Sequence, residues 1–227
     1  MGNNRCYIAV YDNAIFGMEF GKTFLFTLAM SVLLLPATAA ELVISEDLLV
    51  EIPLSEGWAL HLEPPDALVK EMAGHVAHEP AAANASAAQI EKVTRKRMAA
   101  NEAFVYHAAS GAHLEIDFSP LEQGASAPST KTLQTSAEYA AQSLEGEEDV
   151  SNVVWEVLPV KVQGAREAFQ LVADYQQHDL PVKFVGTIGY VEGYWFFLYF
   201  TDPGQSPEVF EQMQEMLGKL VVRHSAH

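Results

Sequence analysis

Apolar and polar positions alternate through the second half of the chain with the period of two that is typical of β-strands. The alternation predicts four strands, over 153–162, 166–175, 181–191 and 194–201. Glu192-Gly193 predicts a tight hairpin turn between the last two, because glycine readily takes a positive φ. The last strand is apolar at odd and even positions alike, so we expect both of its faces to be covered.

The first half mixes shorter strand patterns with helical ones. A strand-like segment over 42–62 is interrupted at Pro53, and a hairpin over 103–118 turns at Ser110-Gly111. On its second strand His113, Glu115 and Asp117 share the face that we expect to be solvated.

Four segments carry apolar residues at helical spacing, namely 66–78, 87–101, 132–144 and 207–220. Ser206 is the expected N-cap of the last of these helices, with Pro207 at its first position. Short hairpins between strands predict antiparallel pairing. The sequence therefore predicts an α+β fold, an antiparallel meander of about six or seven strands sandwiched by α-helices.

The N-terminal region predicts export. Lys22 precedes the uncharged apolar run 24–35, and the small residues 37–40 follow Pro36, as in a secretory signal peptide cleaved before Ala40 or Glu41. The apolar run is shorter than the roughly 20 residues that span a bilayer. We expect 1–40 to be leader and signal peptide, and 41–227 to be one domain with a helical segment over about 65–102.

The segment that precedes this signal leaves two interpretations open. Translation starts at Met18, which begins a conventional signal, or 1–17 is an unstructured leader. The mature protein is expected to be periplasmic or secreted, with no stable membrane span. Cys6 is the chain's single cysteine, so cleavage would exclude disulfides and cysteine nucleophiles.

Charge narrows the classes of partner. The chain has 30 acidic and 13 basic residues, a formal net charge of −17. A strongly basic nucleic-acid binder is excluded, because phosphates would be repelled. The same charge keeps an exported protein soluble and suits a basic partner or cations.

The order of elements resembles a known group. Its marks here are Ile52-Pro53, Gly57-Trp58, the aromatic strand 194–200 running into Thr201-Asp202-Pro203, and the final helix 207–220. This order is similar to the Mog–PsbP-like fold group, including exported bacterial proteins related to DcrB. The resemblance is best over 153–222 and looser over 41–62. It implies the fold and a binding or assembly role, and it transfers no functional residue.

Two sets of residues are candidates for specific chemistry. His75 and His78, spaced by three on one predicted helix, are metal-ligand candidates, although two histidines supply only part of a site and also fit a polar helix face. The cluster 92–97 is basic against an acidic background. Its residues are candidates for binding an acidic partner or an anion, although charge runs of this kind more often form a solvated helix face. They are Lys92, Arg95, Lys96 and Arg97.

No catalytic pattern stands out. The sequence has no phosphate-binding loop and no nucleophile elbow with both glycines. We expect a non-catalytic exported protein without a cofactor, which binds, assembles or stabilises an envelope component, with an envelope protein as its partner. The alternative is a periplasmic module for a small ligand or a divalent metal, and an enzyme of another type stays open.

Overall fold

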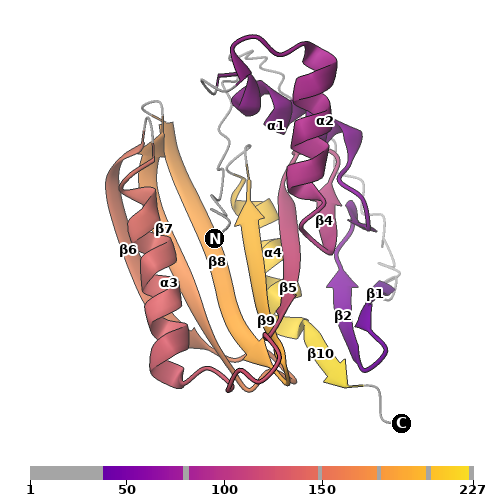
Figure 1. Ribbon diagram of the computed structural model, residues 1–227, viewed down its shortest axis with the longest axis vertical. Helices are drawn as coiled ribbons and strands as arrows, with labels where there is room; N and C mark the ends of the chain where they lie inside the picture. Colours follow the sequence, from indigo (N-terminus) through magenta and orange to yellow (C-terminus); the bar gives the residue numbers. More distant parts are fainter. Residues whose placement is uncertain (1–37, 79–81, 148–149, 178–179, 203–205, 225–227) are drawn as a thin grey trace, which may run out of the picture.

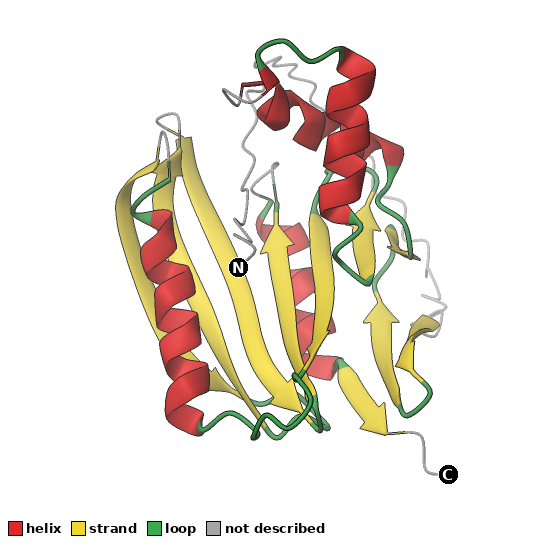
Figure 2. Ribbon diagram, in the orientation of Figure 1, coloured by secondary structure: helices red, strands yellow, loops and turns green. Residues whose placement is uncertain are grey.

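The computed structural model describes residues 38–78, 82–147, 150–177, 180–202 and 206–224 (Figures 1 and 2). In chain order the elements are β1 (Thr38–Ser45), β2 (Leu48–Leu54), β3 (Trp58–His61), α1 (Asp66–His78), α2 (Ala87–Met98), β4 (Ala103–His107), β5 (His113–Pro120), α3 (Thr130–Leu144), β6 (Val150–Val160), β7 (Glu167–Gln177), β8 (Leu180–Val191), β9 (Tyr194–Thr201), α4 (Pro207–Lys219) and β10 (Val221–His224).

A seven-stranded antiparallel sheet organises the molecule, in the order β3-β4-β5-β9-β8-β7-β6. The strands β6 to β9 follow one another as the predicted meander, and β9 then pairs with β5. Gly193, with φ at 93°, forms the predicted turn between β8 and β9. The α+β class and the antiparallel sheet are confirmed.

A second, three-stranded sheet was not foreseen in the sequence. It has the order β1-β2-β10, so the strand-like segment 42–62 is divided between two sheets. The C-terminal β10 pairs antiparallel with β2, where Val222 lies opposite Val50. β10 extends to His224, whose backbone pairs with Leu48 of β2.

Helices cover both faces of the large sheet, as predicted (Figure 1). α3 packs on one face, where Leu133 and Ala137 meet Ile188 of β8. α4 packs on the other face, where Met213 meets Phe200 of β9. The alternating residues of β9 therefore enter two different cores.

α1 and α2 lie on the same side as α3 but over the far end of the sheet. Leu68 and Met72 of α1 and Met98 of α2 pack on Phe104 of β4. Phe104 faces that side because it lies opposite Glu115, which in turn lies opposite Tyr199 of β9. The two helices thus form a unit over β4 and β5, separate from α3.

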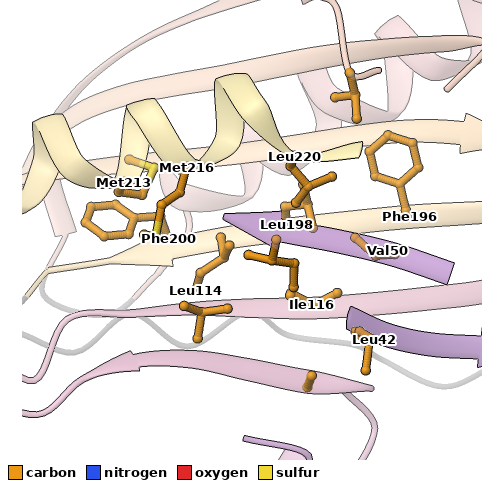
Figure 3. Packing of buried hydrophobic residues seen from close by; sticks show 14 of the residues in the cluster. Leu42, Val50, Leu114, Ile116, Phe196, Leu198, Phe200, Met213, Met216 and Leu220 are labelled. Atoms are coloured by element: carbon orange, nitrogen blue, oxygen red, sulfur yellow. The ribbon is translucent and has the colours of Figure 1, made fainter. Parts of the chain in front are cut away.

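The main core lies between α4, the large sheet and the small sheet (Figure 3). Leu114, Phe200 and Met213 are at most 1% exposed there, and β2 adds Val50. Ser206 caps α4 by accepting a hydrogen bond from the Val209 amide, as predicted. Complete burial of such side chains supplies the main free energy of folding.

The predicted signal peptide lies mostly outside the described residues. β1 begins at Thr38, so both predicted cleavage positions, before Ala40 and before Glu41, fall within this strand. Either cut would leave Leu42, which is 3% exposed, in the core. Within the described ranges, no helix combines the length and the apolar character needed to cross a membrane.

Candidate functional site

The basic cluster predicted to bind a partner lies on α2, which begins with a strong local signal. Ser86 is the N-cap: its hydroxyl accepts a hydrogen bond from the Gln89 amide, and the Gln89 side chain accepts one from the Ser86 amide. This capping box satisfies two amides that have no partner within the helix. The buried residues Thr94 and Met98 fix which face of α2 points inward.

Arg95, one of the four predicted basic residues, is already engaged within the protein. Its Nη2 lies 2.7 Å from Asp66 Oδ1 on α1 and 3.0 Å from Glu91 Oε1 on α2. The hydrogen bond from Arg95 lowers the pKa of the Asp66 carboxyl, which is therefore ionised at neutral pH. Arg95 holds the two helices together, and this explains its position better than partner binding does.

Lys92 and Lys96 are placed differently. Both are exposed, they are four residues apart on one helix, and neither forms an ion pair with any described residue. Val93 beside them is 43% exposed, and Arg97 is also exposed. We call Lys92, Val93, Lys96 and Arg97 the α2 face. It joins positive charge to an apolar side chain in a protein of net charge −17.

A polar cluster lies beneath α1, and it corrects one sequence expectation. His113 of β5 is not on a solvated face, because its residue is only 2% exposed. Its Nδ1 lies 3.3 Å from the Gly111 carbonyl oxygen, and its Nε2 lies 3.6 Å from Glu115 Oε1. Burial lowers the pKa of His113, but the Glu115 carboxylate, the Gly111 carbonyl and the charge of Glu71 together outweigh burial, so that the pKa is raised overall.

α1 contributes Glu71 to this cluster. Burial raises the pKa of Glu71, and the charge of His113 opposes that rise. Glu71 Oε1 is buried and has no hydrogen-bond partner among the residues that the structure describes. Tyr106, opposite His113 on β4, also has a raised pKa, from burial first and from Glu71 second. An unsatisfied buried carboxyl oxygen is costly, so this carboxyl is driven towards its neutral form.

The acidic end of the cluster reaches the surface along β5. Glu115 Oε2 accepts a hydrogen bond from Asn101 Nδ2 at 2.9 Å. The next carboxyl on the same face, that of Asp117, has its pKa raised to about 6 by burial and by the charges of Glu102 and Glu115. The cluster can take up protons near neutral pH, but a ring as buried as that of His113 cannot reach a substrate in this conformation.

The predicted metal-ligand candidates His75 and His78 lie near the end of α1, spaced by three as expected. Their side chains lie outside the described residues, so their role in metal binding stays a prediction. In the part of the chain that the structure describes, no group of three or more His, Cys, Asp or Glu side chains is arranged to hold a metal ion.

Sequence reasoning missed the polar cluster. The residues Glu71, Asn101, Tyr106 and His113 come from α1, from β4 and β5 and from the segment before β4, and no motif connects them. The period of two placed His113, Glu115 and Asp117 on one side, which is correct. It could not reveal that α1 covers His113 and leaves Asp117 half exposed.

Comparisons with known proteins give matches among solved structures. No family model matches the chain, and no curated protein does. A solution structure of cyanobacterial PsbP (CyanoP) from Synechocystis is 8% identical, covers 76% of this chain and 86% of its own, and has a TM-score of 0.46. A crystal structure of LpqN, involved in cell envelope biogenesis of Mycobacterium tuberculosis, is 10% identical to this chain. The match covers 82% of this chain and 91% of LpqN, with a TM-score of 0.48.

Proposed function

We propose that this protein is a non-catalytic binding protein of the cell envelope, which binds an acidic partner protein through the α2 face. The observation that carries the proposal is the pair Lys92 and Lys96 on α2, which are exposed and form no ion pair with any described residue, together with the exposed Val93 on the same helix. Interfaces combine a desolvated apolar contact with charges that steer and orient the partner.

Charge supports an acidic protein as the partner. The chain has 30 acidic residues, so a basic side chain has many possible ion-pair partners within the protein. Arg95 forms ion pairs with two of them, Asp66 and Glu91. Lys92 and Lys96 are exposed, form no ion pair with any described residue, and are available to carboxylates of another molecule. An anionic membrane is a poorer fit, because the net charge of −17 would be repelled from it. The envelope location rests on the predicted signal peptide.

A non-catalytic role agrees with the nature of the polar cluster. Its histidine is enclosed by α1, β4 and β5. The charges of Glu71 and His113 shift each other's pKa. The apolar contacts of Leu68, Met72 and Met98 with Phe104 hold α1 and α2 on the sheet, and we interpret this packed unit as a structural base for the α2 face.

Site-specific photo-cross-linking in intact cells tests the proposal. A photoreactive residue replaces Val93, and in a matched control it replaces Val154 on β6, a valine that is 71% exposed far from α2. We expect an acidic envelope protein to be captured at position 93 alone, and the capture to be lost on combining Lys92→Gln with Lys96→Gln. Equal capture at both positions, or capture that survives the double substitution, would contradict the proposed function.

The partner's chemistry needs its own check. The captured protein is identified by mass spectrometry, and binding of the two purified proteins is measured at increasing salt. We expect the affinity to fall with salt, because exposed charge pairs are screened. Binding that does not depend on salt would exclude the acidic partner.

A further inference from the structure

A surface pocket lies beside the start of α3, where β6 turns into β7. Its volume is about 370 Å³, which is at the small end of the range for sites of small organic ligands. Thr130 of α3 forms one wall. The connection between β6 and β7, residues 161–166, forms the opposite rim, with the ends of both strands below it.

The rim is held rigidly against the small sheet. The Val222 amide of β10 donates a hydrogen bond to the Gln163 carbonyl oxygen at 2.8 Å. Gly164 has φ at +88°, and a Cβ there would lie 1.7 Å from the Val222 carbonyl oxygen, so only glycine fits this close approach. Val162 is 6% exposed and anchors the rim in the core. A rim fixed in this way loses little entropy when a ligand binds.

Two cations, Lys161 and Arg166, line the pocket. Lys161 and Arg166 are exposed, and neither side chain forms an ion pair with any described residue. Among the lining residues the one carboxylate is that of Glu167. It is already hydrogen-bonded within the protein, because its Oε1 accepts a hydrogen bond from the Thr130 hydroxyl at 2.7 Å. The charge of the lining is therefore net positive in a strongly acidic protein.

The remainder of the lining is apolar. Phe169 and Ala168 are 7% and 4% exposed, and Pro159, Val160 and Ala165 complete the surface. An inorganic anion would gain nothing from these side chains, whereas a hydrocarbon group would be removed from water against them. The positive charge of the lining favours a ligand with a negatively charged group, and its apolar side chains favour a ligand that also carries a hydrocarbon group.

We propose that this pocket binds a small amphiphilic carboxylate, with its head between Lys161 and Arg166 and its hydrocarbon body over Phe169. The guanidinium of Arg166 can hold both carboxylate oxygens, and Lys161 adds a point charge. Free carboxylate in solution is the source to which we commit, because the net charge of −17 disfavours approach to an anionic bilayer.

Titration of the purified protein with octanoate tests the site, read by the amide shifts of residues 159–169 in NMR spectra. Octylammonium is the probe of reversed charge, and inorganic phosphate is the probe without an apolar body. We expect saturable shifts in this segment with octanoate and with neither of the other two. Equal binding of octylammonium, or of phosphate, would overturn the proposal.

Three variants locate the binding. Lys161→Gln with Arg166→Gln should weaken octanoate binding by about tenfold or more, because two charge-assisted hydrogen bonds are lost. Lys92→Gln with Lys96→Gln makes the same change in net charge on α2 and should leave the affinity unchanged. Ala165→Trp, which fills the pocket and keeps both cations, should also abolish binding. Unchanged affinity in the first variant, or equal loss in the first two, would refute the site.

Discussion

Asp117 makes the stability of this protein depend on pH in a direction that can be calculated. Its pKa is raised from 3.8 to about 6, chiefly by burial and then by the charges of Glu102 and Glu115. A carboxyl with a raised pKa in the folded state stabilises the protein when protonated. That stabilisation is complete below pH 3.8 and is lost as the pH rises through about 6.

The magnitude follows from the shift after a correction for solvent. A difference of about two pKa units corresponds to nearly 3 kcal/mol at roughly 1.4 kcal/mol per unit. Because the Asp117 side chain is only half-buried, solvent screens much of the interaction, and we take about 1 kcal/mol as the realistic cost of its ionisation. Replacing Asp117 by Asn should therefore stabilise the protein by about 1 kcal/mol at pH 7.5 and by almost nothing at pH 4.

Urea unfolding of wild type and Asp117→Asn, measured from pH 4 to pH 8, checks this prediction. The matched control is Glu156→Gln, which removes one negative charge from the opposite face of the sheet, where Glu156 is exposed on β6. The control corrects for the general relief of self-repulsion in so acidic a protein. The reasoning would be refuted if Asp117→Asn raised the free energy of unfolding equally at pH 4 and pH 7.5. An increase no larger than that in Glu156→Gln would refute it as well.

Three further substitutions test the packing. Gly164→Ala should destabilise the protein by at least about 2 kcal/mol in urea unfolding, because the added Cβ meets the Val222 carbonyl oxygen and the positive φ disfavours alanine. Met213→Ala should cost about 2–5 kcal/mol, since Met213 is 0% exposed in the main core. Ser206→Ala should cost about 1 kcal/mol through loss of the α4 cap, and Ser206→Asp should restore it. A neutral result at any of these positions would show that the corresponding contact does not form.

Local patterns predicted those elements whose signals are complete within a short segment. Ser206-Pro207 marked the start of α4, and Glu192-Gly193 marked the turn before β9. Gly189 within β8 has a similarly local reason, because a Cβ there would lie 2.2 Å from Phe196 Cζ. In each case one or two residues determine the backbone, so no knowledge of distant partners was needed.

Features that depend on distant pairing could not be predicted in the same way. β10 is four residues long, and it is a strand because β2 offers it an edge. His113 is buried because α1, some forty residues earlier in the chain, packs over it. The pocket exists because Gly164 brings the connection between β6 and β7 against Val222. Periodicity indicates which side chains share a face, but tertiary packing decides what covers that face.

The two proposed sites can be tested independently because they lie at opposite ends of the molecule (Figure 1). α2 stands at one end, and the connection between β6 and β7 stands at the other. Each site contains two exposed cations without an ion pair among the described residues, so the two double Gln variants change net charge equally. Each variant is therefore the control for the other, and any effect common to both comes from overall charge. Loss of partner capture only in the Lys92 and Lys96 variant, with loss of octanoate binding only in the Lys161 and Arg166 variant, requires two separate local sites.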